Sequence, residues 1–165
     1  MPISSDVLYG ITFCVALSNG LLGGLFFIFS NTIMKALARI SPQCGIAAMQ
    51  AINIVILNPT FLTLFIGTAL VSLCLGIFAA IYVPKPAQLS LIAGSILYVV
   101  GCFFVTITCH VPRNDALAKI NSDHPDAIPI WQNYLMTWTR WNHVRTVSTF
   151  ASTFCFIHAL CQING

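Results

Sequence analysis

Charge is the scarcest property of this sequence of 165 residues. Charged side chains make up 7% of it and glutamate is absent, whereas soluble domains average about 25% charged residues. Apolar residues account for 58%. This balance excludes the surface of a soluble domain and indicates a membrane protein. The net charge of +3 is small and scattered, so nucleic acid is excluded as a partner.

The motifs of several common enzyme classes are also missing. There is no nucleophile elbow, no P-loop and no Rossmann glycine fingerprint, which removes the usual hydrolase, kinase and dehydrogenase interpretations. The seven cysteines are an odd number and include no C-x-x-C pair. We interpret them as small, buried apolar residues rather than as a disulfide or metal framework. Cys155 and His158, at i and i+3, are also expected to pack in the core.

Four largely apolar runs are long enough to cross a bilayer as helices. They cover residues 8–30, 61–83, 89–109 and 146–163. The first is not a secretory signal peptide, because it lacks a basic flank and its apolar core is too long. The connections are short and predict antiparallel neighbours. The expected fold is therefore an all-α membrane protein, a single up-and-down four-helix transmembrane domain over residues 1–165.

The helices are expected to extend past the bilayer on one side. The first continues through residue 39, where Lys35 and Arg39 face water. The second is expected to be one helix over residues 45–82 with a kink at Asn58-Pro59. The third continues through Ile120 with a kink at Pro112.

The last helix is expected to begin near Ile130, after a polar loop over residues 121–129 that includes His124. Its first turns present one face at helical spacing. That face carries Trp131, Tyr134, Leu135, Trp138, Trp141, Asn142 and Arg145. Six of the seven Lys and Arg side chains lie in the first and third connections, and Lys85 alone lies in the second. The positive-inside rule then predicts an integral protein of the plasma or inner membrane with this end in the cytoplasm and both termini outside.

Most polar residues near the spans gather at that same end of the predicted bundle. They are Gln50, Asn53, Asn58, His110, Arg113, Asn114, Asn142, His143 and Arg145. Polar groups near hydrocarbon are costly, and ionisable ones mark functional sites by default. With Trp138 and Trp141 as aromatic walls, the set has the profile of a small-molecule site. The alternative is that the asparagines cross-link helices, the arginines snorkel to phosphate and the tryptophans form an interfacial belt.

The two histidines of this set are expected at similar depth on adjacent helices. His110 and His143 could together hold a haem or, with a third ligand, a metal such as copper. However, Asn114 and Asn142 are poor partners for that chemistry, and the nearest carboxylate, Asp115, is expected to face water. We therefore predict no cofactor and no metal, with haem or copper as the alternative.

Four stretches of the sequence resemble the anthrone-oxygenase-like membrane family. They are residues 24–30 with Met34 and Leu37, residues 48–53 with Asn58-Pro59-x-Phe61, residues 111–118 (Val-Pro-Arg-Asn-Asp-Ala-Leu-Ala), and Trp138-x-x-Trp141-Asn142-x-x-Arg145-Thr146. The resemblance implies a small four-helix membrane protein. Some relatives oxidise anthrones to anthraquinones with molecular oxygen, without a dedicated flavin or nicotinamide. The family's motif residues map here to Asn53, Asn58, Pro112, Asn114, Trp138, Asn142 and Arg145, and His110 and His143 are neighbours of these motifs.

The expected function is a membrane oxidoreductase, a cofactor-independent monooxygenase that acts on a small hydroxylated aromatic. A base, His110 or His143, would remove a proton, and Arg145 or Arg113 would stabilise the developing negative charge. Catalytic roles are predicted for His110, His143, Arg145 and Asn114. Substrate contacts are predicted for Gln50, Asn53, Asn58, Arg113, Trp138, Trp141 and Asn142.

Two other functions remain open at this stage. One is a non-catalytic membrane protein that binds a lipid-like ligand or a partner, and the other is a haem- or metal-bearing redox protein. The expected partners are membrane lipid and a small apolar or aromatic substrate, and a homo-oligomer is left open.

Overall fold

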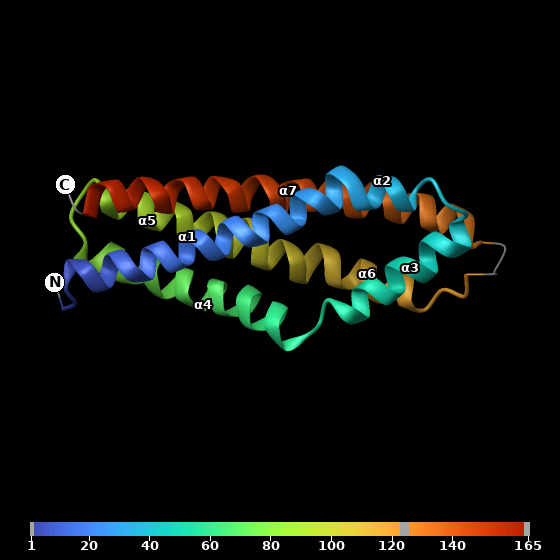
Figure 1. Ribbon diagram of the computed structural model, residues 1–165, viewed down its shortest axis with the longest axis horizontal. Helices are drawn as coiled ribbons and strands as arrows, with labels where there is room; N and C mark the ends of the chain where they lie inside the picture. Colours follow the sequence, from blue (N-terminus) through green and yellow to red (C-terminus); the bar gives the residue numbers. More distant parts are fainter. Residues whose placement is uncertain (1, 123–125, 164–165) are drawn as a thin grey trace.

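The four apolar runs form four long helices that lie side by side along one axis, with both termini at the same end (Figure 1). The structure is a computed structural model that describes residues 2–122 and 126–163. Within these ranges it contains helices and turns and no strands. Continuous helices cover Ser5–Leu37, Pro59–Tyr82, Ala87–Ala118 and Ala127–Ile163, and each is long and apolar enough to cross a membrane. The predicted all-α four-helix membrane bundle is confirmed.

Two of these long helices contain π-helical turns. The first consists of α1 (Ser5–Ile28), η1 (Phe29–Ile33) and α2 (Met34–Leu37). The third consists of α5 (Ala87–Tyr98), η2 (Val99–Phe104), η3 (Thr106–His110) and α6 (Val111–Ala118). The other elements are α3 (Pro42–Val55), α4 (Pro59–Tyr82) and α7 (Ala127–Ile163).

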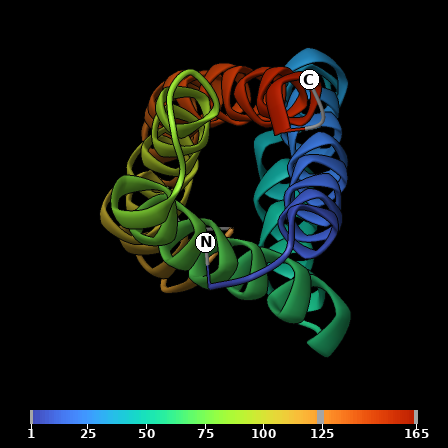
Figure 2. The same cartoon turned by 90° about the vertical axis from the view of Figure 1, so that its left-hand side faces the viewer.

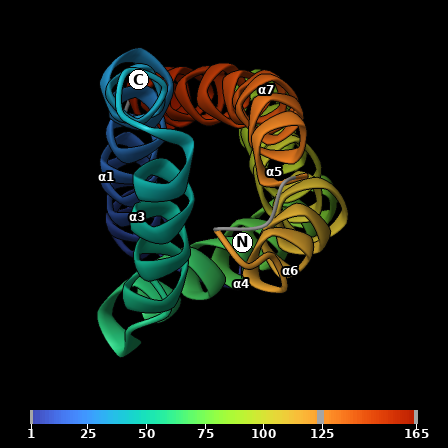
Figure 3. The same ribbon diagram turned by 90° about the vertical axis from the view of Figure 1, so that its right-hand side faces the viewer.

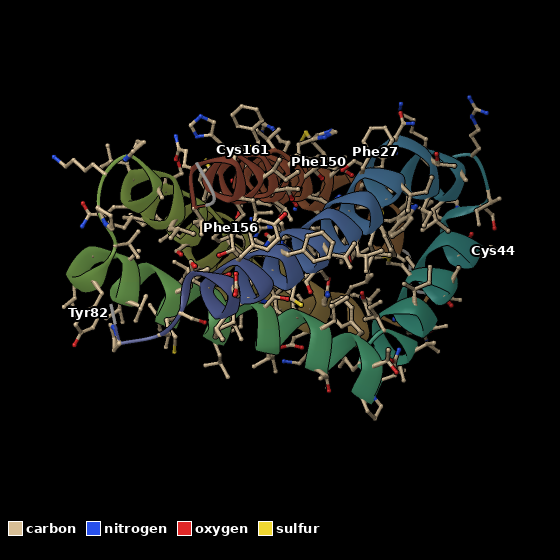
Figure 4. The ribbon with its side chains drawn as sticks, turned by 60° about the vertical axis from the view of Figure 1, so that its left-hand side comes forward. Phe27, Cys44, Tyr82, Phe150, Phe156 and Cys161 are labelled. Carbon is tan, nitrogen blue, oxygen red and sulfur yellow. The ribbon has the colours of Figure 1, made fainter. Side chains whose placement is uncertain are left out.

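The helices are longer than a bilayer requires, and the excess lies at one end. About 20 residues cross the hydrocarbon region, whereas three of the helices have 33, 32 and 37 residues. Their extra turns, together with α3, build what we call the motif end: α2, α3, α6 and the first half of α7. Cys44 lies at this end and Tyr82 at the opposite one (Figure 4). The predicted extension at one end is confirmed, and the first helix ends at Leu37 rather than at residue 39.

The second helix is broken rather than kinked, so the prediction of one helix over residues 45–82 is wrong. α3 ends at Val55, α4 begins at Pro59, and the two meet at a corner (Figure 1). A residue that precedes proline is disfavoured in the α region, and Asn58 is extended, with φ −84° and ψ 159°. Its side chain accepts a hydrogen bond from the Phe61 N–H and donates one to the Val55 carbonyl. The break is stable because Asn58 satisfies backbone groups at both helix ends.

Pro112 does not interrupt the third helix. Proline removes one helical hydrogen bond and its ring crowds the carbonyl four residues earlier. Here the turn just before it, η3, is π-helical, and π-helical turns are frequent at functional sites. The Arg113 side chain also donates to the Cys109 carbonyl. The chain therefore passes Pro112 as a helix and ends at Ala118, close to the predicted end at Ile120.

The last helix begins at Ala127, three residues earlier than predicted. Pro129 falls in its first turn, where a missing N–H costs nothing because that group has no helical partner. Part of the predicted loop over residues 121–129 is therefore helical. His124 lies outside the described residues.

The core is divided between the two halves of the bundle. Two clusters fill the half that holds the termini, one around Leu8, Leu91 and Phe156 and the other around Leu22, Phe65 and Tyr98. In the view from that end, the four helices surround a common axis (Figure 2). A third cluster fills the motif end and consists of Met34, Leu37, Ile46, Met49, Leu117, Ala127, Trp131, Tyr134 and Trp138. In the view from the motif end, α3 lies beside α1 and α6 lies on the other side of the bundle (Figure 3).

The cysteines are free, but most do not occupy the core. Cys102 is fully buried, whereas Cys14, Cys44, Cys74 and Cys161 are exposed. The interpretation of the cysteines as buried residues is wrong for these four, because they lie on the outward faces of their helices.

Candidate functional site

The motif end encloses a cavity of about 410 Å³ between the first helix, α3, the η3–α6 segment and α7. Four aromatic rings line it, from Phe26, Phe29, Phe61 and Trp138. Its polar lining consists of Gln50, Asn53, Thr106, His110, Asn114, Asp115 and Arg145. The structure therefore brings together six of the residues predicted from the sequence, namely Gln50, Asn53, His110, Asn114, Trp138 and Arg145.

Arg145 is the charged group of this cavity. Its side chain is only 6% exposed. Nη1 donates to the Thr106 hydroxyl at 3.2 Å and Nη2 donates to Oδ1 of Asn142. The guanidinium carbon also lies 4.3 Å from the centre of the Phe26 ring and 5.4 Å from that of Trp138. All these contacts are neutral, and within the described residues no carboxylate pairs with the guanidinium, so the cavity keeps a buried positive charge.

Asn142 holds this guanidinium in place without lining the cavity. It is fully buried, and its Nδ2 donates to the Phe26 carbonyl at 2.7 Å and to the Ser30 hydroxyl at 2.6 Å. Its Oδ1 is the acceptor for Arg145. The amide therefore ties α7 to the first helix and aligns Arg145. The structure does not place Asn142, a predicted substrate contact, in the cavity lining, and its amide is fully used by protein groups.

Asn114 holds the aromatic side chains of Tyr134 and Trp138 in place by hydrogen bonds. Its Oδ1 accepts hydrogen bonds from the Tyr134 hydroxyl at 2.8 Å and from Nε1 of Trp138 at 3.0 Å. These bonds fix the position of the Trp138 ring between the cavity and the core. The helical spacing predicts that Tyr134 shares a face of its helix with Trp138, but it does not predict the hydrogen bond between Tyr134 and Asn114. A helical pattern shows which face a residue occupies and not which side chain it meets.

His110 presents one free ring nitrogen. The side chain is 1% exposed, and its Nδ1 lies 3.5 Å from the Val105 carbonyl oxygen. The ring meets Trp138 edge-on, with 4.9 Å between ring centres. Nε2 is buried and has no hydrogen-bond partner. Because His110 also lines the cavity, this buried nitrogen lies beside the cavity without a protein partner.

Three buried nitrogen atoms of the cavity residues lack a hydrogen-bond partner: Nε of Arg145, Nδ2 of Asn53 and Nε2 of His110. The first two can only donate. A buried polar group without a partner costs about 1–3 kcal/mol of folding free energy. All three of these groups lie around one cavity, beside or within the positively charged guanidinium of Arg145. The arrangement suits a ligand that brings acceptor oxygens, and an anionic oxygen best of all.

The rim of the cavity is apolar and faces outward. Ile54, Leu57 and Val111 are 75%, 63% and 43% exposed, and all three line the cavity. Ile54 lies in the last turn of α3, and Leu57 lies in the break between α3 and α4. Asp115, which was expected to face water, is exposed but also lines the cavity. The mouth thus combines a mostly apolar edge with a single carboxylate.

Gln50 links two helices in the wall of the cavity. Its Nε2 donates to the Leu117 carbonyl at 2.8 Å and to the Ile120 carbonyl at 3.0 Å. The Leu117 carbonyl lies in the last turn of α6 and the Ile120 carbonyl lies just beyond the end of α6. Gln50 therefore joins α3 to α6 and closes this side of the cavity.

The structure does not bring the remaining predicted residues into the cavity. Asn58 caps α4, and Arg113 lies on another face of α6, where it binds the Cys109 carbonyl. Trp141 is 36% exposed, and His143 is exposed and lines a separate surface recess. The prediction that Trp141 and His143 share the site is wrong, because consecutive helical residues point about 100° apart and α7 turns Asn142 and Arg145 inward instead.

The positions of the histidines also matter for the alternative of a bound metal or haem. His110 and His143 line different hollows, so the predicted pair of facing histidines is not formed. Within residues 2–122 and 126–163, no three His, Cys, Asp or Glu side chains come together as metal ligands. Cys155 and His158 do not form a ligand pair either, since the two ring nitrogens of His158 face Ser90 and Gln162. The expectation that both pack in the core is wrong for His158, which is exposed, and Cys155 is half-buried.

Comparison with known protein families identifies a match over the second and later helices. A family model described as anthrone oxygenase matches residues 61–155, which is more than half of the chain. The matched region contains α4, the third helix and most of α7, and so includes His110, Asn114, Trp138, Asn142 and Arg145. No curated protein and no solved structure matches the chain.

Proposed function

Because this chain belongs to the anthrone oxygenase family, we propose that it is a membrane oxygenase that oxidises a small hydroxylated aromatic with molecular oxygen. The observation that carries the proposal is the cavity at the motif end, where three unpartnered nitrogens and a buried positive charge stand beside an aromatic wall. Oxygen is the oxidant, and the proposal requires no cofactor.

The aromatic lining suits a flat, hydroxylated ring. Phe29 and Trp138 lie with their ring centres 5.7 Å apart, and Phe26 lies under the guanidinium of Arg145. Aromatic side chains offer large apolar contact area with restricted geometry. A ring held against Trp138 would place its hydroxyl or carbonyl oxygen within reach of Arg145 and Asn53.

The first chemical step is removal of a proton from the substrate. Nε2 of His110 accepts a proton from a ring methylene activated by a neighbouring carbonyl or phenol. The negative charge moves onto the substrate oxygen, where Nε of Arg145 and Nδ2 of Asn53 donate to it. Donors fixed in advance in a site that excludes water stabilise such charge most effectively.

The electron-rich anion then reduces oxygen. It transfers one electron to O₂, and the resulting radical and superoxide join through a new C–O bond. The protonated His110 returns its proton to give a hydroperoxide. Loss of the second methylene hydrogen as a proton breaks the O–O bond, and water leaves. The overall change is CH₂ + O₂ → C=O + H₂O, so the two electron pairs of the C–H bonds reduce one oxygen molecule to the carbonyl oxygen and water.

The apolar rim supports a lipophilic substrate. Ile54 and Leu57 project outward beside the break between α3 and α4 and also border the cavity. A ligand dissolved in the bilayer could therefore enter sideways without crossing a polar surface. The same observation supports a second candidate function, the non-catalytic binding of a lipid-like ligand.

The test compares His110, which lines the cavity, with His143, which does not. Purified protein in nanodiscs is supplied with an anthrone, and oxygen consumption and quinone formation are measured. His110→Ala is expected to abolish turnover, and His143→Ala to retain it, because His143 lies outside the cavity. Equal activity of both variants would exclude His110 as the base. Wild-type protein that binds the anthrone without consuming oxygen would favour the binding function instead.

A further inference from the structure

We propose that a second hollow, on the outer surface between the end of the first helix and α7, binds the phosphate headgroup of an anionic phospholipid. This recess has a volume of about 450 Å³. Its rim carries Lys35, Arg140 and His143, and its apolar lining includes Met34, Leu135 and Met136. α2 and α7 lie next to each other along this surface (Figure 1). The recess shares no lining residue with the cavity described above.

The charge of the recess is positive and is supplied by both helices. Lys35 comes from α2, and Arg140 and His143 come from α7, where they lie about one turn apart. No lining residue is acidic. Lys35 donates to Oδ1 of Asn31 at 3.4 Å, a neutral partner that leaves its charge intact. Lys35 and Arg140 beside an apolar hollow match a phosphate attached to an acyl chain more closely than they match a free anion.

The height of the recess along the bundle also fits a headgroup. On α1 the exposed apolar surface includes Phe27 and Ile28, at 48% and 42% exposed, and Lys35 follows two turns later. On α7 Val147 is 68% exposed, and Arg140 lies two turns before it. The cations thus lie two turns beyond strongly exposed apolar residues of the same two helices. Exposed polar residues such as Gln132 and Asn133 are mixed with apolar ones such as Met136 at this level. Trp141, which is 36% exposed at this level, is typical of a membrane interface.

The recess backs onto the groups that position Arg145. Ser30 lines the recess and is itself almost fully buried, and its hydroxyl accepts the hydrogen bond from Asn142. A change at Ser30 would therefore affect both sites at once. Lipid binding is better followed by native mass spectrometry and by thermal stability, which do not depend on turnover.

The experiment uses charge-matched variants in defined lipids. Wild-type protein, Lys35→Gln/Arg140→Gln and a control, Arg39→Gln/Lys119→Gln, are placed in phosphatidylcholine nanodiscs with and without phosphatidylglycerol. The control removes the same charge from exposed residues at the same end, outside the recess. Phosphatidylglycerol should remain bound to wild type and control, and raise their melting temperatures. For the recess variant we expect the affinity for phosphatidylglycerol to be roughly thirty-fold lower. Each basic residue near an anionic surface contributes about 1 kcal/mol, and the loss of two such contributions corresponds to about that factor.

Three outcomes would overturn the proposal. Equal loss of lipid in the control would show general attraction to the basic end rather than a site. Retention of phosphatidylglycerol by the recess variant would place the lipid elsewhere. A melting-temperature increase with inorganic phosphate alone, equal to that with the lipid, would identify a site for free anions.

Discussion

Asn142 and Arg145, one turn apart on α7, form the hydrogen bond that connects the candidate site to the rest of the bundle. Oδ1 of Asn142 accepts from Nη2 of Arg145, while Nδ2 of Asn142 is held by the Phe26 carbonyl and the Ser30 hydroxyl on the first helix. The guanidinium is thus aligned by a residue that does not itself line the cavity. This relationship gives the first of four predictions.

Replacing Asn142 should reduce activity through Arg145. In Asn142→Leu the guanidinium loses one of its two acceptors and can shift. A displacement of about 1 Å at a reacting group can cost about 10²-fold in rate. We expect kcat/KM for the anthrone to fall by about that factor, as measured by oxygen consumption. The control is Asn133→Leu, an exposed position on the same helix. Full activity of Asn142→Leu would exclude the positioning role.

Replacing Arg145 should separate activity from stability. Arg145→Met removes a buried charge that has no paired carboxylate in the described residues, and apolar residues in place of buried charges are often neutral or stabilising. We expect the melting temperature in detergent to stay equal to that of wild type or to rise, while turnover is lost. Arg39→Met, at an exposed position outside both the cavity and the recess, should keep its activity. A large fall in melting temperature for Arg145→Met would mean that this arginine serves the fold.

Replacing Asn58 should affect stability and leave catalysis unchanged. Asn58→Ala removes the cap of α4, a loss of about 1 kcal/mol in the free energy of unfolding. The residue lies outside the cavity, so kcat/KM should be the same as in wild type. Asn58→Ser, which retains a capping oxygen, should recover most of the stability. A specific loss of substrate affinity in Asn58→Ala would restore the substrate contact that was expected from the sequence.

Narrowing the rim should slow entry from the bilayer. Leu57→Trp places a larger side chain at an exposed position that also borders the cavity. With substrate supplied in nanodisc lipid, kcat/KM should fall several-fold, whereas the melting temperature should not change. Leu70→Trp is the control, because Leu70 is 59% exposed on α4 and does not line the cavity. Equal kinetics in both variants would argue for a different entrance.

Much of this architecture could be predicted from the residue pattern. Long apolar runs can satisfy their backbone groups in a bilayer only as helices or closed barrels, so composition and run length are enough to predict a helical bundle. Short connections then bring His110, Asn114 and Arg145 to one end, whatever the details of packing. The family motifs of α6 and α7 lie in the region that the family model matches.

Packing between the helices decided which side chains face the cavity, because the periodicity of the sequence does not specify how a helix is rotated about its own axis. One residue along α7 turns a side chain by about 100°, and the contacts with the first helix place Asn142 and Arg145 inward, and Trp141 and His143 outward. For the same reason the sequence does not predict the hydrogen bonds of Tyr134 and Trp138 to Asn114, since the partners come from different helices. At Asn58-Pro59 the local sequence allowed a kink or a break, and a side chain that could satisfy both helix ends favoured the break.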